Sequence, residues 1–328
     1  MGHPFKHIII LLLLMLPVQL LAQDGEHLSK GNEHYRNGEY TEAIKSYRIA
    51  ISKGENPALS WFNLANAWYQ NGNPEKAVSC YESSVAIAPE FPRGWINLGV
   101  LYYELKDYGA CIAALDRALQ LKAADAMIWS LLASAHKELE HYGIAAMYFE
   151  KAVEADSSLS DAYLALYDIA RITGDNSEAL RWLSRYPQAG GRYYDVLLLS
   201  GELQLESGDT AAALATLRQC TATNPSRIQG WILLVNVLEN MGATYTALIE
   251  ADRALDNDDS SVSLALIAGR IAFENGYYDK AERYFGQAYK NGSADGMVGL
   301  GNLLVHYERY GDIQGINRIR TVLADGTR

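Results

Sequence analysis

Side chains that could act in catalysis are present in this sequence, but they do not stand at the spacings that a catalytic site needs. The histidines form no His-Glu-x-x-His motif of the kind that binds zinc on one face of a helix: His3, His7, His27, His34, His136, His141 and His306. No serine lies in a Gly-x-Ser-x-Gly sequence, and no glycine-rich loop is placed to cradle phosphate groups before a helix. The sequence therefore predicts no catalytic residue, no metal site, no cofactor and no enzymatic activity.

The net charge of the chain excludes two classes of ligand, nucleic acids and anionic lipid surfaces. The formal net charge is −11 over 328 residues. Nucleic acids and anionic lipid surfaces both require a basic protein surface, so neither is expected as a partner. Recognition of another protein, of the chain itself or of a glycan remains.

The first 22 residues have the layout of a cleavable signal peptide. Lys6 precedes an apolar run from Ile8 to Leu16, Pro17 ends this run, and Ala22 supplies a small residue at the expected cleavage site. The apolar stretch is shorter than the ~20 residues that a membrane-spanning helix needs. We therefore expect an exported protein without a stable membrane anchor after cleavage. A periplasmic location is favoured, and a secreted or surface-associated one stays open.

The elements that position any binding residues are set by an internal repeat. Trp61, Trp95 and Trp129 follow one another at intervals of 34 residues, and Trp231 lies on the same grid. A fixed period of this length indicates a stack of similar units rather than one globular core. Units begin at residues 24, 58, 92, 126, 160, 194, 228 and 262.

Within a unit, two sets of apolar or small residues recur at helical spacing. They occupy positions 4, 7, 8 and 11 and then positions 20, 24 and 27, counted from the start of the unit. Glycine near position 15 marks a turn between the two helices, because it can adopt the left-handed conformation. Each unit is therefore predicted to be a helical hairpin, with small residues at positions 8 and 20 that let its helices approach closely.

This pattern resembles the tetratricopeptide repeat family. The unit that begins at residue 58 carries the family's residue types at nearly every characteristic position: Trp61, Leu64, Ala65, Trp68, Ala77, Tyr81 and Pro89. The resemblance implies an all-α fold, a right-handed α-solenoid of stacked hairpins. It would contain about eight 34-residue units and a degenerate C-terminal capping unit.

Departures from the pattern indicate the domain organisation. The fifth unit is irregular and ends in the flexible segment Pro187–Gly191, so we expect an N-terminal array over 24–191 and a C-terminal array over 194–327. Whether this segment is a hinge is left open. After residue 293 the phase slips, and Met297, Leu300, Gly301 and Leu304 restart the pattern of a ninth unit from residue 294.

The three cysteines are Cys80, Cys111 and Cys220, an odd and sparse set that does not indicate a disulfide framework. Cys111 occupies the small-residue position 20, where a thiol behaves as a small apolar group. Because Cys80 and Cys111 lie on second helices of neighbouring units, a bridge between them is conceivable but not favoured.

The resemblance also implies where a ligand would bind. In this family, ligands usually occupy a concave groove lined by the first helices, through positions 2, 5, 6, 9, 12 and 13. Aromatic rings would supply contact area and asparagine amides would pair with a peptide backbone. The implied groove residues are Asn32, Tyr35, Phe62, Asn63, Asn66, Tyr69, Arg93, Asn97, Tyr103, Lys137 and Arg171.

These observations predict a non-enzymatic scaffold or adaptor that binds a segment of a partner protein, within a cell-envelope assembly or secretion complex. Two alternatives stay open. The solenoid could associate with itself into a homo-oligomer, or it could bind glycan or peptidoglycan or activate an envelope hydrolase.

Overall fold

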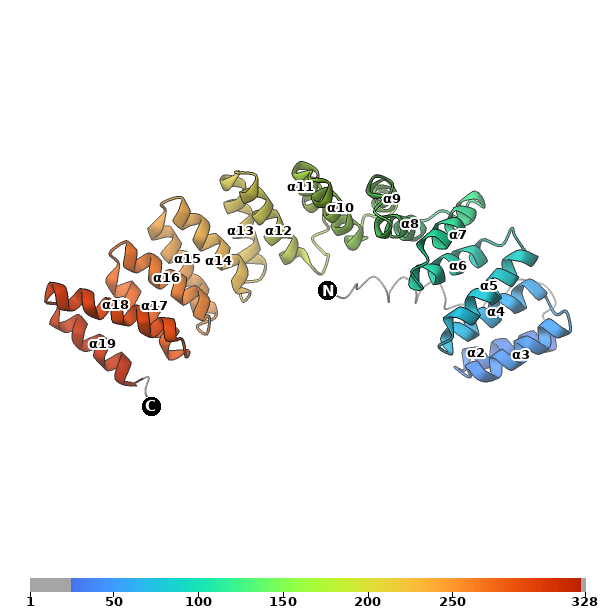
Figure 1. Cartoon of the computed structure of the whole chain (residues 1–328), viewed down its shortest axis with the longest axis horizontal. Helices are drawn as coiled ribbons and strands as arrows, with labels where there is room; N and C mark the ends of the chain where they lie inside the picture. The colour runs from blue at the N-terminus through green and yellow to red at the C-terminus, as the bar shows by residue number, and fades with distance from the viewer. Residues whose placement is uncertain (1–24, 326–328) are drawn as a thin grey trace. The chain divides into compact units, whose positions relative to one another are not determined.

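A computed structural model describes residues 25–325 of the chain, and every regular element within these residues is an α-helix (Figure 1). The predicted signal peptide, residues 1–22, lies outside this range. The described helices form hairpins, each with a short turn between a first and a second helix. The chain divides into two compact units between Pro187 and Gln188.

The first unit contains five hairpins, which are α2 (Glu26–Arg36) with α3 (Tyr40–Ser52), α4 (Pro57–Gln70) with α5 (Pro74–Ile87), α6 (Pro92–Glu104) with α7 (Tyr108–Gln120), α8 (Ala126–Glu138) with α9 (Tyr142–Ala155), and α10 (Ser160–Thr173) with α11 (Asn176–Ser184). The second unit contains four, which are α12 (Tyr193–Glu206) with α13 (Thr210–Thr223), α14 (Ile228–Asn240) with α15 (Thr244–Asn257), α16 (Val262–Glu274) with α17 (Tyr278–Lys290), and α18 (Ala294–Tyr310) with α19 (Ile313–Asp325). Within each unit, every second helix also packs against the first helix of the next hairpin. This arrangement confirms an α-solenoid of stacked hairpins.

The turns between paired helices use the left-handed backbone conformation. The predicted turn glycines all have positive φ, between 74° and 81°: Gly38, Gly72, Gly174, Gly208, Gly242 and Gly276. In the hairpins α6–α7 and α8–α9 the same position holds Lys106 and Glu140, with φ of 63° and 59°. A side chain makes the left-handed conformation unfavourable. Lys106 and Glu140 adopt it nevertheless, because their hairpins have the same tight turn as the others.

Close approach of the paired helices depends on small residues at positions 8 and 20. Every residue at position 20 is fully buried: Ala43, Ala77, Cys111, Ala145, Ala179, Ala213, Ala247 and Ala281. At position 8, a Cβ atom added to Gly31 would lie 2.5 Å from the ring of Tyr47, and one on Gly99 would lie 2.7 Å from Leu115. Tyr47 and Leu115 both occupy position 24, so a small residue at position 8 makes room for a large one opposite.

The hairpin α14–α15 reverses this arrangement. It carries the larger Val235 at position 8 and the smaller Ala251 at position 24, and both are fully buried. The combined volume of the two positions is thus roughly maintained while their sizes are exchanged. Close packing of protein interiors makes such paired changes more favourable than a change on one side alone.

The last hairpin differs in detail from the prediction. The side of α18 that packs into the unit carries Gly296, Gly299, Leu300, Leu303 and Tyr307, whereas Met297 is 47% exposed. The predicted stripe of Met297, Leu300, Gly301 and Leu304 is therefore correct at Leu300 and Leu304, which pack into the core, and wrong at the exposed Met297 and at Gly301, whose Cβ position has no neighbour within 4 Å. The aromatic ring of Phe285 accounts for this rotation, because it lies within 2.6 Å of the Cβ position of both Gly269 and Gly299. A glycine at each of these two positions makes room for the ring.

Within the described residues, no helix is both long and apolar enough to traverse a bilayer.

Candidate functional site

The predicted tyrosines at position 12 lie on the face that the first helices of unit one form. Tyr35, Tyr69 and Tyr103 belong to the successive helices α2, α4 and α6, and each is partly exposed. The Tyr69 hydroxyl donates a hydrogen bond to Glu104 Oε1, 2.9 Å away on the next first helix. Tyr35 packs its ring edge-on against Tyr40, and Tyr103 packs in a tilted pair against Tyr108, each with centroids 5.5 Å apart.

Burial changes the acidity of these hydroxyls. Desolvation, reinforced by neighbouring Tyr40, raises the pKa of Tyr35 to about 12. Desolvation also raises the pKa of Tyr69 and of Tyr103, with further contributions from Glu104 and Glu138 respectively. The three hydroxyls therefore stay protonated at any physiological pH. The proton of Tyr69 is donated to Glu104, so toward a ligand this hydroxyl is an acceptor while that bond is kept.

The same column becomes basic on the next two first helices. Lys137 on α8 holds its Nζ 2.9 Å from Asp168 Oδ2, with its side chain 27% exposed. Arg171 on α10 donates a hydrogen bond of 2.7 Å to Asn176 Oδ1. Arg93, at the start of α6, is exposed. Position 12 thus runs from three tyrosines to two cations over five consecutive first helices.

The four predicted asparagines and Phe62 are not available to a ligand in this structure. Asn32, Asn63, Asn66 and Asn97 are at most 6% exposed, and Phe62 is 2% exposed. We expected their side chains to contact a ligand, and the structure corrects this, because packing between neighbouring hairpins covers them.

Their amides instead form hydrogen bonds inside the unit. Asn32 Oδ1 accepts from Tyr47 Oη and from Asn63 Nδ2, both at 2.9 Å. One repeat later, Asn66 Oδ1 accepts from Tyr81 Oη and from Asn97 Nδ2. Each of these two networks joins a first helix, its own second helix and the next first helix. The asparagines therefore set the spacing of the first helices that carry the tyrosine column, and they add no exposed side chain to that column.

Two clefts on the side of the second helices were missed by the sequence reasoning. One, of about 730 Å³, is bordered by α3 and α5 and has Trp61 and Trp68 of α4 in its lining. The other, of about 580 Å³, lies one repeat on, between α5 and α7, with Trp95 and Tyr102 of α6. Trp61 and Trp95, both at position 4, are only partly buried and line open surface.

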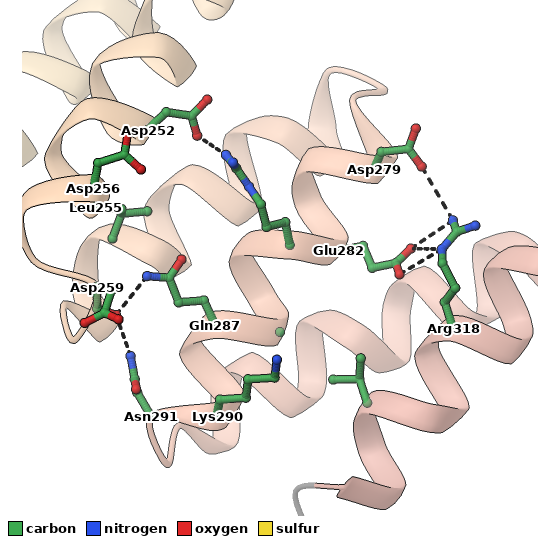
Figure 2. A pocket seen from close by; sticks show the side chains of 13 residues that line it. Asp252, Leu255, Asp256, Asp259, Asp279, Glu282, Gln287, Lys290, Asn291 and Arg318 are labelled. Atoms are coloured by element: carbon green, nitrogen blue, oxygen red, sulfur yellow. Dashed lines mark hydrogen bonds and ion pairs between the residues drawn. The ribbon is translucent and has the colours of Figure 1, made fainter.

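The second unit contains a polar cleft of about 600 Å³ formed by α15, α17 and α19 (Figure 2). Arg318 lies against Glu282 on one side of it, with Nε–Oε1 at 3.0 Å, and Gln287 and Asn291 both donate to the carbonyl oxygen of Asp259 on the other. The hydrogen bonds to Glu282 raise the pKa of the Arg318 guanidinium. The sequence alone did not indicate this cleft, because these partners lie 28 to 36 residues apart.

Opposite charges also pair around Asp252 in this cleft. Burial would raise the pKa of Asp252, but hydrogen bonds from Lys280 and Tyr284 and the nearby Arg283 charge outweigh it, so the pKa is lowered. Lys280 Nζ lies 2.6 Å from Asp252 Oδ2. Asp252 pairs with Lys280 and Arg283, and Glu282 pairs with Arg318. These ion pairs form a structural network between hairpins.

Among residues 25–325, no group of three or more His, Cys, Asp or Glu side chains is arranged to hold a metal ion. The three cysteines are free and buried, so Cys80 and Cys111 are not bridged. Burial raises the pKa of Cys80 and Cys220 to about 11 and that of Cys111 to about 12. These thiols are therefore protonated and unreactive at neutral pH.

Comparison with known families decides the classification. Four tetratricopeptide repeat models match residues 28–91, 70–135, 127–159 and 195–226, which together make up half of the chain. The chain belongs to the tetratricopeptide repeat family. The matches stop at residue 159 and resume at 195, on either side of the irregular hairpin α10–α11.

Solved structures with a similar fold cover most of the length of this tetratricopeptide repeat protein. A chain of the Naa15/Naa10 complex bound to HypK-THB is 16% identical with a TM-score of 0.55, and the match covers 93% of this chain and 51% of that one. The C-terminal part of a TPR repeat-containing protein from Cytophaga hutchinsonii is 14% identical with a TM-score of 0.55, covering 73% and 99%. At these identities the likeness shows the fold alone. No curated protein sequence matches the chain.

Proposed function

We propose that this protein is a non-catalytic scaffold that binds a segment of a partner protein on the first-helix face of its first unit. The observation that carries the proposal is the position-12 column, in which Tyr35, Tyr69, Tyr103, Lys137 and Arg171 stand on five consecutive first helices. Tyrosine offers a large, rigid contact area with a polar tip, which suits a recognition surface.

The column favours a particular kind of segment. Adjacent packed helices lie about 8–10 Å apart, so five first helices span roughly 40 Å, the length of about 12 extended residues. Apolar or aromatic residues of the partner would lie on the tyrosines. Acidic residues would lie near Lys137 and Arg171, where they would compete with Asp168 for Lys137.

The cellular setting is part of the proposal. The signal-like residues 1–22 motivate an exported protein that serves a cell-envelope assembly or secretion complex. Export is tested by fractionating cells of the native organism and comparing the N-terminus of the recovered protein with the expected cleavage after Ala22. A protein that keeps residues 1–22 and fractionates with the cytoplasm would remove the envelope role.

A second candidate surface rests on the paired clefts with tryptophan in their lining. The clefts at Trp61 and Trp95 are one repeat apart, on the side of the second helices. Aromatic rings at regular spacing would also suit the faces of sugars, so this is where a glycan or peptidoglycan ligand would be placed. Failure of the protein to bind purified cell-wall sacculi would remove this alternative.

One experiment separates the two surfaces. An aromatic photo-crosslinking amino acid is placed at Tyr69, at Glu82 in the lining of the second tryptophan cleft, and at the exposed Glu154 of α9 as a control. Each variant is expressed in the native organism, and adducts are identified by mass spectrometry. A protein adduct from Tyr69 alone is expected; adducts from Glu82 alone would move the function to the clefts.

A charge variant then tests the predicted polarity of the segment. Replacing Lys137 and Arg171 together by Gln should reduce the yield of the Tyr69 adduct, while replacing the exposed Lys151 and Lys122 should not. Equal yields from both pairs of variants would contradict the expected acidic segment.

A further inference from the structure

The outward face of α18 carries a continuous stripe that no other described residue covers. The exposed residues on this face follow one another at alternating spacings of three and four: Asp295, Val298, Asn302, Val305 and Arg309. Val298 is 56% exposed and Val305 is 65% exposed. A three-and-four spacing places side chains along one face of a helix, and this is the pattern through which two helices pack together.

In earlier hairpins, two of the equivalent positions contact the next first helix. Counted from Ala294, Asn302 is position 9 and Val305 is position 12. At position 9, Asn66 is bonded to Asn97 of the following hairpin. At position 12, Lys137 is paired with Asp168, and Glu239 with Arg270, again on the following first helix. On α18 the same two positions, Asn302 and Val305, are exposed, and no further described hairpin packs against them.

The stripe is complementary to itself. Asp295 lies in the first turn of α18 and Arg309 in the last, with Asn302 midway between them. If a second α18 is laid antiparallel on the first about Asn302, each Asp295 faces Arg309 of the other copy, and each Val298 faces Val305. A two-fold interface requires this self-complementarity, because the same patch is used on both subunits.

Head-to-tail stacking is not favoured by the same comparison. The exposed face of α2 in the first described hairpin carries Lys30, Glu33 and Arg36. Placing these charges on Val298 and Val305 would bury ionic side chains against apolar ones without partners, which is unfavourable. A second α18 matches the stripe in both its apolar and its charged residues.

We infer that this protein forms a two-fold dimer through antiparallel packing of α18 against α18 of a second copy. The helix is about 25 Å long at 1.5 Å per residue, so the interface is small and the dimer is expected to dissociate at micromolar concentration. The interface uses no residue of the first-helix face of the first unit and does not depend on the function proposed for that face.

Charge reversal tests the antiparallel register. Sedimentation velocity on the purified protein should show a concentration-dependent dimer. Asp295→Arg and Arg309→Asp should each raise the dissociation constant by about tenfold or more, because each places like charges opposite one another at two sites. The double variant Asp295→Arg/Arg309→Asp should recover the dimer, since it exchanges the two charges without changing their pairing. Circular dichroism checks that each variant is folded.

Cysteine crosslinking tests the position of the two-fold axis. Asn302→Cys should form a disulfide-linked dimer under mild oxidation, whereas Glu33→Cys on α2 should not. The native cysteines are buried and give little background. A monomer at every concentration tested, or a double reversal no better than the single ones, would overturn the inference. A mixed disulfide between one copy carrying Glu33→Cys and another carrying Asn302→Cys would replace it with head-to-tail stacking.

Discussion

The junctions between hairpins are built in two different ways in the two units. Between α2, α4 and α6, buried asparagines and tyrosines form hydrogen-bonded networks centred on Asn32 and Asn66. In the second unit, the asparagine positions of α14 and α16 hold Leu233, Asn236, Ile267 and Arg270, none of which is buried, and the fully buried residues between α14, α16 and α18, such as Leu234, Ala268 and Leu300, are apolar. The helical repeat is the same, but the buried part of one junction contains directional bonds, whereas that of the other is apolar, with the Glu239–Arg270 ion pair at its surface.

This difference predicts how each junction should respond to amino-acid substitution. A buried hydrogen bond contributes only about 1 kcal/mol net, but leaving one partner unsatisfied costs about 1–3 kcal/mol. An apolar junction has no such partner to lose and is sensitive to volume instead. The two units should therefore fail under different kinds of substitution.

The largest expected effect is overpacking of the second unit. Gly269→Val should destabilise the protein by about 3 kcal/mol, because the added atoms collide with the ring of Phe285, which also lies against Gly299. Urea denaturation followed by circular dichroism measures this. Gly143→Ala is the matched control, since no atom lies within 4 Å of its Cβ position; a loss as large as that of Gly269→Val would contradict the packing argument.

The next largest effect is loss of one member of a polar network in the first unit. Asn66→Ala should destabilise the protein by about 2 kcal/mol, because it leaves the buried Tyr81 hydroxyl without its acceptor and removes one acceptor of Asn97 Nδ2. The same denaturation experiment applies.

The triple variant Asn66→Leu/Tyr81→Phe/Asn97→Leu sharpens the comparison. It replaces every member of the network and gives the first unit an apolar junction like those of the second. It should be destabilised less than Asn66→Ala alone, since no polar group is left unsatisfied. A larger loss in the triple variant would show that the directional bonds themselves stabilise this junction.

A smaller effect is expected from pH. Burial raises the pKa of Cys111 in the first unit to about 12 and of Cys220 in the second to about 11. The unfolded chain loses these protons near pH 9, so each contribution to stability is complete below about pH 9 and falls above it by roughly 1 kcal/mol per pH unit until the folded pKa is reached.

Cys111→Ala should remove part of this slope with little change in packing, because alanine stands at position 20 in the other hairpins. Unfolding free energies measured from pH 8 to pH 11 check it. An unchanged slope in Cys111→Ala would show that other groups, such as the buried tyrosines, account for the whole loss.

The smallest effect concerns the turns. Lys106→Gly and Glu140→Gly should each stabilise the first unit by about 0.5–1 kcal/mol, since glycine adopts positive φ without strain. The second unit already has glycine at this position in its first three hairpins, so Gly208→Ala should destabilise it by a similar amount. Thermal denaturation resolves such differences, and a loss of stability in Lys106→Gly would contradict the strain argument.

The period of the sequence predicted the fold well, because packing of a repeat depends on few residue types. Position 20 had to be small and the turn had to accept positive φ, and both are visible in single letters. The rotation of α18 was not predicted, because it depends on the ring of Phe285 meeting Gly269 and Gly299, which are 30 residues apart.

The candidate site was predicted only in part, for a physical reason. Tyrosine, lysine and asparagine on a first helix all appear polar in a sequence. The short amide side chain of asparagine is covered by the next hairpin, whereas the longer side chains of tyrosine and lysine reach the surface. Tyr69 is partly exposed while Asn66, one turn before it, is 3% exposed. The tryptophan clefts were missed because each is lined by residues of three successive helices, whose arrangement a repeat pattern does not show.

The buried networks also bear on how such an array can change over generations. The acceptor Asn66 at position 9 of one hairpin meets the donor Asn97 at position 6 of the next, and Asn32 and Asn63 meet in the same way one hairpin earlier. A copy of α4–α5, which carries both Asn63 and Asn66, would therefore bring the donor and the acceptor that its neighbours need. The pairs Glu239–Arg270 and Asp252–Lys280 occur at one junction only, so a copied hairpin in the second unit would not find these partners again.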